Sequence, residues 1–230
     1  MLGGNMDVVY ILRNGIEGEE LRYSLRSLKN LPHDRVWFFG GEPEGLVPDE
    51  QVTLNQHGIS NWEKVCWTLT QVCNNEAVSE NFYLFNDDFV VMKQVKEIPP
   101  YYDGTLLKRI DQIKMRTGGF SLYMNELEKV RELLLEEGKK TYNYAVHVPM
   151  VINKDKAIEV LRKYPRIAMF RTLYGNYWNV GGRQMKDCKI TDSTKPSKEA
   201  KFLSTTEHSF ESNVGDYIRS VFSEKCKYEV

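Results

Sequence analysis

Two short apolar runs separated by an amphipathic segment most constrain the fold of this chain. The first run, DVVYIL, spans residues 7–12, and the second, VWFFGG, spans residues 36–41. Between them, segment 19–31 places leucines on one helical face, and Pro32 ends it. A strand, a helix and a second strand in this order form a βαβ unit, whose strands run parallel. The sequence therefore predicts an α/β fold built on a parallel sheet.

The rest of the chain continues this alternation. Residues 62–73 place apolar side chains on one helical face, and FYLFNDDFVVM at 82–92 is an apolar strand interrupted by two aspartates. Further helices are expected at about 125–138 and 155–163, with another near the C-terminus. The aromatic, Gly- and Asn-rich stretch 171–182 is expected to be a loop.

Length and hydropathy set the domain organisation. A chain of 230 residues is long enough for one packed α/β domain and short for two. We expect a single domain over residues 1–230, in which 99–230 is a helical and loop elaboration. No window approaches the roughly 20 apolar residues of a membrane span. The first ten residues lack a basic region followed by an apolar stretch, so we expect a cytoplasmic protein without a secretory leader.

Charge, cysteines and missing motifs exclude several classes of function. The net charge of −1 disfavours a protein that coats nucleic acid. The four cysteines form no CxxC pair, which disfavours a zinc site and fits a reducing compartment. The chain has no GxGxxG, P-loop lysine or GxSxG motif, so it resembles no Rossmann dehydrogenase, P-loop kinase or serine hydrolase.

Asp87 and Asp88 are the sharpest chemical signal. They follow the apolar residues 82–85, and carboxylates at the end of a buried strand are costly unless a cation, a hydrogen-bond network or water compensates them. Ligands of open α/β sheets bind at this end of the strands, and two carboxylates suit Mg²⁺ or Mn²⁺ with a diphosphate. The alternative is a solvated Asp-Asp turn.

A basic stripe on the first predicted helix is the second candidate. Arg22, Arg26 and Lys29 share one helical face, and arginine binds phosphate oxygens in bidentate fashion. The alternative is an ordinary solvated helix face. Glu20 beside the stripe is either a general base, a ligand of substrate hydroxyls, or a favourable charge at the helix N-terminus.

His147 and Arg171 complete the candidates. His147 lies in the apolar extended run YNYAVHVPM, where a neutral imidazole is either a metal ligand, a proton acceptor or a hydrogen-bonded structural group. Arg171 precedes three aromatic residues that either stack on a base or sugar ring or complete the core.

Four motifs in chain order carry a family resemblance: DVVYILRNG, ELRYSLRSL, FYLFNDDF and AVHVPM. They resemble the successive conserved regions of the Stealth family, hexose-1-phosphate transferases of capsule synthesis. The resemblance covers residues 7 to about 172, and ELRYSLRS is its most specific part. It implies a GT-A-like (Rossmann-like) fold, with a central, mostly parallel sheet flanked by helices, that binds a nucleotide-diphospho-sugar with Mg²⁺ or Mn²⁺.

Matching the motifs residue by residue, together with the signals above, gives a predicted site. The predicted catalytic residues are Asp88, Arg26, Glu20 and His147. The predicted substrate-binding residues are Tyr10, Arg13, Asn14, Gly15, Arg22, Asn86 and Arg171. The predicted metal ligands are Asp87, Asp88 and His147. This chain departs from the family's usual Trp-Val-Asp-Gly-Ser stretch at residues 11–15, which leaves the donor preference open.

Three hypotheses for the function follow. The first is a metal-dependent transferase that moves a sugar or sugar phosphate from a nucleotide-diphospho-sugar to a hydroxyl of a polysaccharide or protein. The second keeps this chemistry but takes a hydroxymethylated base of phage DNA as the acceptor, extruded from the duplex. The third is a non-catalytic module that binds a nucleotide sugar.

Overall fold

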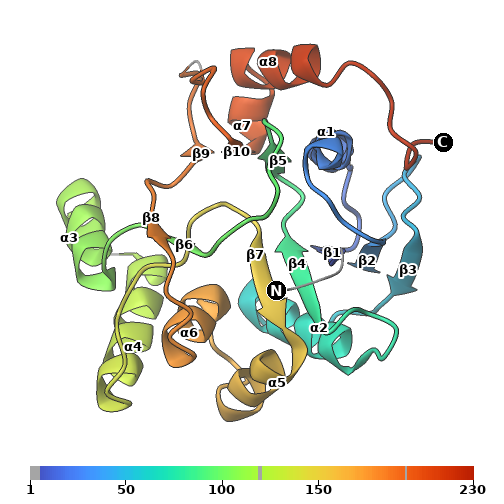
Figure 1. The fold of residues 1–230 in the computed structure, drawn as a ribbon. Helices are drawn as coiled ribbons and strands as arrows, with labels where there is room; N and C mark the ends of the chain where they lie inside the picture. The colour runs from blue at the N-terminus through green and yellow to red at the C-terminus, as the bar shows by residue number, and fades with distance from the viewer. Residues whose placement is uncertain (1–5, 119–120, 195) are drawn as a thin grey trace.

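The structure, a computed structural model, describes residues 6–118, 121–194 and 196–230 around a five-stranded central sheet (Figure 1). The strand order is β3-β2-β1-β4-β7, in which β7 alone is antiparallel to its neighbour. The bounds are Asp7–Leu12 for β1, Val36–Gly40 for β2, Glu50–Thr53 for β3, Asn81–Phe85 for β4 and Met150–Asn153 for β7. The prediction of a central, mostly parallel sheet flanked by helices is confirmed.

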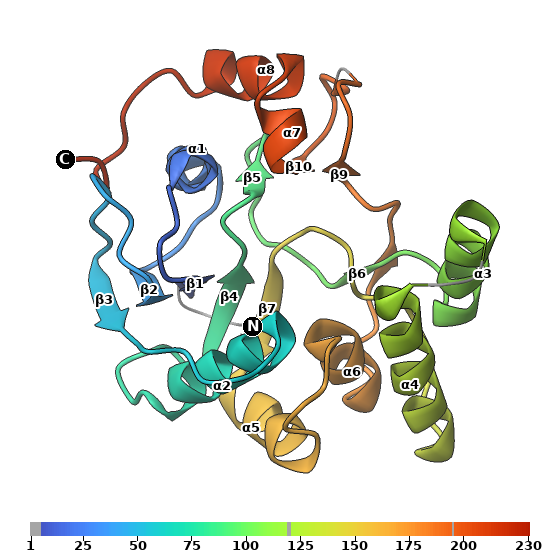
Figure 2. The same cartoon turned by 180° about the vertical axis from the view of Figure 1, so that it is seen from behind.

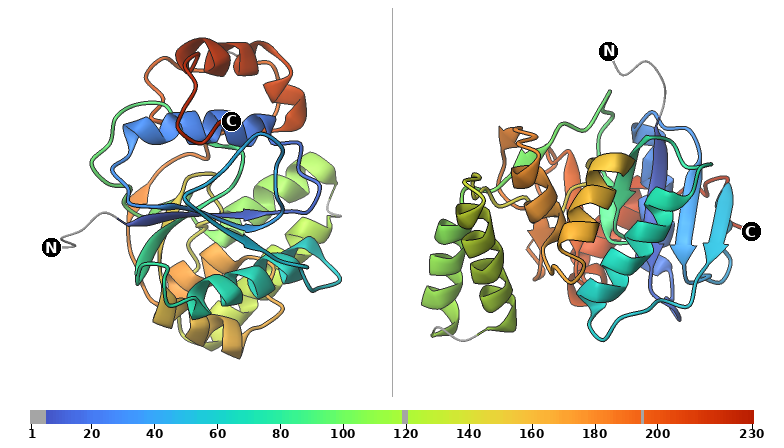
Figure 3. Two further views of the ribbon diagram at one scale, coloured as in Figure 1. Left: turned by 90° about the vertical axis from the view of Figure 1, so that its right-hand side faces the viewer. Right: turned by 90° about the horizontal axis from the view of Figure 1, so that it is seen from below.

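The central strands are buried because helices cover both faces of the sheet (Figure 3, left). Along β1, Val8 and Tyr10 pack on the face covered by α1 (Glu19–Ser27), whereas Val9 packs on the opposite face. The opposite face is covered by α2 (Asn61–Asn74), α5 (Lys154–Lys163) and α6 (Phe170–Tyr177), as Figure 2 also shows. This two-sided burial explains the continuous apolar runs in the sequence.

Shorter elements surround the sheet. The helices α3 (Leu106–Thr117) and α4 (Leu122–Glu136) pack together beside α6 (Figure 1). A small sheet contains β5 (Phe89–Val91), β10 (Phe202–Thr205) and β9 (Lys189–Ile190), and a second contains β6 (Tyr101–Tyr102) and β8 (Arg183–Gln184). The remaining elements are η1 (Leu28–Asn30), α7 (Glu207–Phe210) and α8 (Asn213–Val221). None of the described helices is long and apolar enough to cross a membrane.

Two sequence-based predictions of secondary structure are wrong. The stretch 171–182 is not simply a loop, because α6 occupies its first part and buries Phe170, Leu173 and Tyr174 against the sheet. The predicted strand 82–92 is two strands in different sheets. The chain leaves the central sheet at Asn86 and then forms β5, which belongs to the three-stranded sheet.

The arginines of α1 hold the C-terminal segment rather than a substrate. Arg26 donates from Nε to Glu229 Oε1 at 2.6 Å and from Nη2 to Oε2 at 2.7 Å, and its Nη1 donates to the Phe222 carbonyl at 2.8 Å. Arg22 Nη1 donates to Glu229 Oε2 at 2.9 Å. The side chain of Glu229 is fully buried. Arg26 is thus tied to Glu229 through two nitrogens and Arg22 through one, and neither arginine lines the pocket described below. The roles predicted for Arg26 in catalysis and for Arg22 in substrate binding stay predictions.

This buried cluster predicts a large loss of stability for Glu229→Ala. Burial favours the neutral form of Glu229, but hydrogen bonds from Arg26, the Cys226 N–H and Arg22 outweigh it and lower the pKa to about 2. We expect the free energy of unfolding, measured in urea at neutral pH, to fall by about 3–5 kcal/mol, because the buried Arg26 guanidinium and the partly exposed Arg22 lose their partner. The difference in unfolding free energy between the wild type and Glu229→Ala should shrink as the pH falls from about 4.5 toward 2, because the wild-type carboxylate becomes protonated.

Lys227→Ala is the matched control. Lys227 lies on the same C-terminal segment as Glu229 and pairs with Asp49, but the lysine side chain is 64% exposed. Its loss should therefore cost at most about 1 kcal/mol. Equal losses for the two variants would contradict the assignment of Glu229 as the anchor of this segment.

Candidate functional site

A pocket of about 740 Å³ opens at the carboxyl ends of β1 and β4. These two strands are neighbours, yet the chain moves outward from β1 to β2 and β3 before it returns to β4 on the other side. The point between β1 and β4 is therefore the topological switch point of the sheet, where open α/β sheets bind ligands. The loop after β1 supplies Arg13 and Asn14, and the end of β4 supplies Asn86 and Asp87.

The charged side chains around this pocket are mostly cationic. Four arginine and lysine residues line it from four different parts of the chain: Arg13, Lys64, Arg109 and Arg171. Among the described residues that line it, the carboxylate is Asp87 alone. Such a wall favours an anionic ligand with several charges, since guanidinium groups bind phosphate oxygens strongly.

Arg171 is the cation most clearly available for a ligand. Its Nη2 donates to Asn86 Oδ1 at 2.9 Å, its Nη1 donates to the Val148 carbonyl at 3.2 Å, and its guanidinium lies 4.8 Å from the centre of the Phe89 ring. All of these partners are neutral. Burial lowers the pKa of Arg171 to about 10, although the charge of Asp88 opposes this shift. The guanidinium is therefore a largely desolvated cation that a phosphate would stabilise.

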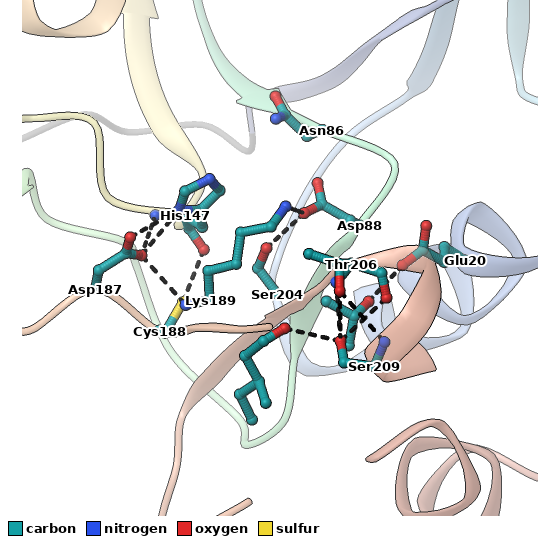
Figure 4. A network of polar contacts seen from close by, with 12 residues as sticks. Glu20, Asn86, Asp88, His147, Asp187, Cys188, Lys189, Ser204, Thr206 and Ser209 are labelled. Atoms are coloured by element: carbon teal, nitrogen blue, oxygen red, sulfur yellow. Dashed lines mark hydrogen bonds and ion pairs between the residues drawn. The ribbon is translucent and has the colours of Figure 1, made fainter. Parts of the chain in front are cut away.

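Asp88 is compensated by the protein itself. Its Oδ2 accepts hydrogen bonds from Lys189 Nζ at 2.9 Å and from Ser204 Oγ at 2.5 Å (Figure 4). Two other carboxylates lie nearby. Burial, with the charge of Asp88, raises the pKa of Asp87. Burial also raises the pKa of Glu20, although a hydrogen bond from Thr205 at 2.5 Å opposes this.

His147 forms a dyad with Asp187. The ring Nδ1 lies 2.9 and 3.0 Å from the two carboxylate oxygens, and the His147 backbone N–H donates to the same carboxylate at 3.1 Å (Figure 4). Burial alone would raise the pKa of Asp187, but its contacts with His147 lower it. Because a carboxylate only accepts, the Nδ1 atom carries a proton, and Nε2 is left for the pocket that His147 lines.

The structure brings six of the predicted site residues to one pocket: Arg13, Asn14, Asn86, Asp87, His147 and Arg171. Glu20 and Asp88 lie beside it without lining it. Gly15 sits in the exposed loop after β1. Tyr10 is a correction, because it is fully buried on the α1 face and its hydroxyl shares a 2.8 Å hydrogen bond with Ser24. It packs in the core and does not line the pocket.

The predicted metal ligands do not converge. Asp88 Oδ2 is occupied by Lys189 and Ser204, and His147 Nδ1 is occupied by Asp187. Across residues 6–118, 121–194 and 196–230, no three His, Cys, Asp or Glu side chains are grouped so that they could hold a metal ion. The described residues therefore form no three-ligand cluster, and the site for Mg²⁺ or Mn²⁺ built from Asp87, Asp88 and His147 stays a prediction.

Sequence reasoning missed two residues that complete the site, Asp187 and Lys189. Both lie in a polar stretch without hydrophobic periodicity, and each contacts a partner about 40 or 100 positions away in the chain. A signal that pairs residues over such separations is absent from a single sequence. The structure shows why both belong together, since the segment from Asp187 to Lys189 runs between His147 and Asp88 (Figure 4).

Comparison with known proteins adds little to this geometry. No protein-family model matches the chain, and no curated protein matches it. A crystal structure of the galactosyltransferase LgtC in complex with donor and acceptor sugar analogs is 9% identical, covers 96% of this chain and 97% of LgtC, and gives a TM-score of 0.48. A crystal structure of an active-site mutant of LgtC is 12% identical to this chain. The match covers 97% of this chain and 85% of the mutant's chain, with a TM-score of 0.41. At this level, the likeness carries no conclusion about activity.

The cationic wall predicts that the pocket binds inorganic pyrophosphate through Arg171. We expect pyrophosphate to raise the melting temperature of the wild type. Arg171→Met should weaken binding in calorimetry by about 10- to 100-fold, because hydrogen bonds to charged groups contribute about 1.5–3 kcal/mol. Arg183→Met, at an exposed arginine of β8 outside the pocket, is the control and should bind normally. Unchanged binding by Arg171→Met would contradict the assignment.

Proposed function

We propose that this protein is a transferase that moves a sugar or a sugar phosphate from a nucleoside-diphosphate sugar to an acceptor hydroxyl. The observation that carries the proposal is the cationic pocket at the switch point of the sheet, with a histidine–aspartate dyad in its wall. A diphosphate matches the cations, and a hydroxyl acceptor matches the dyad. The Stealth-like order of the sequence motifs points in the same direction.

The donor would lie across the ends of β1 and β4. Arg171 and Arg13, which line the pocket, would hold the diphosphate, and Asn86 accepts a 2.9 Å hydrogen bond that steadies the Arg171 guanidinium. Trp62 of α2 is half-buried in the same wall and offers an aromatic face for a base or a sugar ring. The volume of about 740 Å³ lies within the usual range of pockets for small molecules and cofactors.

His147 would act as the general base in the transfer step. Its Nε2 takes the proton of the acceptor hydroxyl, while Asp187 holds the ring and stabilises the imidazolium that forms. The hydroxyl oxygen then forms a bond to the anomeric carbon, releasing a nucleoside diphosphate, or to the β-phosphorus, releasing a nucleoside monophosphate. The resemblance to hexose-1-phosphate transferases favours the second outcome, in which the product keeps one phosphate.

The acceptor and the reaction are tested together by product mass. We expect at least one of UDP-glucose, UDP-N-acetylglucosamine and GDP-mannose to raise the melting temperature by mass action. That donor should then yield a product whose mass increases by a sugar plus one phosphate, when offered with polysaccharide, protein and hydroxymethylated-DNA acceptors in parallel. A gain of the sugar alone would show glycosyl transfer. Donor binding without any product would favour the non-catalytic binding module.

Asp187→Asn tests the dyad. We expect kcat to fall by about 10²- to 10⁴-fold, because the amide cannot stabilise an imidazolium as a carboxylate does, while the Kd of the donor stays nearly constant. Asp192→Asn replaces an exposed aspartate of the following loop and should leave both quantities unchanged. If Asp187→Asn instead weakened donor binding and left kcat intact, Asp187 would not act through the base.

A further inference from the structure

Lys189 occupies the position where a divalent cation was expected. It lies in β9, two residues after Asp187, and its ammonium group contacts Asp88 at 2.9 Å while Ser204 donates to the same oxygen. The side chain of Asp88 is only 10% exposed and that of Lys189 25%. Figure 4 shows the lysine side chain extending from the Cys188 side of the site toward Asp88, with His147 nearby.

The three carboxylates of this region already have cationic partners. Lys189 is a charged neighbour of Glu20 and of Asp87 as well as the direct partner of Asp88. Arg13 is a charged neighbour of Asp87, and Arg171 is a charged neighbour of Asp88. Lys189 is thus the cation in direct contact with this group of carboxylates, whereas Arg13 and Arg171 line the pocket. A divalent ion that binds Asp88 Oδ2 would have to displace this ammonium group.

We propose that the Lys189 ammonium group replaces the divalent cation in this site, so that a nucleoside-diphosphate sugar binds without metal. The inference rests on the proposed function. Lys189 neutralises the charge of Asp88 after the end of β4, and it is a charged neighbour of Asp87. Arg13 and Arg171 then contact the diphosphate. An ammonium group fixed on Asp88, beside the pocket, is preorganised to lower the negative charge that the diphosphate meets at this end of β4.

A structural role for the ion pair makes a different prediction. If Lys189 only stabilised the fold, its loss would lower the melting temperature and leave donor affinity unchanged. If it serves the ligand, its loss changes donor affinity in the absence of metal. Donor binding measured with and without a chelator therefore separates the two roles.

The first measurement uses the wild-type protein. UDP-glucose, UDP-N-acetylglucosamine and GDP-mannose are titrated by calorimetry in EDTA and again in Mn²⁺. We expect the binding donor to show the same Kd in both conditions within about twofold. A donor that binds only in Mn²⁺ overturns the inference and leaves the proposed function standing. If no donor binds in either condition, the proposed function fails and the inference fails with it.

Lys189→Met supplies the second measurement. We expect it to lose at least about tenfold in donor affinity in EDTA, and Mn²⁺ to restore part of the loss because Asp88 then lacks its cationic partner. Lys186→Met, at an exposed lysine on the same segment, is the control and should bind as the wild type does. Unchanged affinity of Lys189→Met in EDTA would overturn the inference.

A conservative variant covers the case in which Lys189→Met does not fold. Lys189→Arg keeps the positive charge beside Asp88 and should retain binding in EDTA. If the folded arginine variant bound the donor only in Mn²⁺, while the wild type bound it in EDTA, the position of the ammonium group rather than its charge would be essential. If neither the wild type nor Lys189→Arg bound the donor in EDTA, the inference would be overturned.

Discussion

The electrostatic balance at the end of β4 is the constraint on which the rest of this structure depends. The central strands are buried on both faces, so polar and charged groups collect where the chain leaves the sheet, at Asn86 to Asp88. Burying the carboxylate of Asp88 there is costly, and Lys189 and Ser204 offset that cost with two hydrogen bonds. The small β5-β10-β9 sheet supplies both partners, because β9 carries Lys189 and β10 carries Ser204.

The two sets of arginines near the site have separate roles. Those of α1 face the C-terminal segment and share the carboxylate of Glu229, so they hold that segment in place. Arg171 comes from the start of α6 and is held by neutral oxygens, so its charge is available to a ligand. A sequence motif such as ELRYSLRS therefore marks a structurally important helix without identifying the residues that contact substrate.

The sequence predicts the frame of this fold better than its site. The apolar runs and helical periodicities located β1, α1, β2, α2 and β4, because two-sided burial leaves a clear pattern. They failed at α6, whose glycine and asparagines suggested a loop although its aromatic side chains complete the core. Within the site, Asp87, His147 and Arg171 stood out by context, whereas Asp187 and Lys189 depend on contacts between distant parts of the chain.

Diphosphate binding between the ends of β1 and β4 is what a crystal structure of the protein with UDP or GDP would reveal. We expect phosphate oxygens within hydrogen-bonding distance of the Arg171 guanidinium, beside Asp87, with Lys189 still paired to Asp88. A nucleotide bound elsewhere, or bound here with its phosphates turned away from Arg171, would contradict it.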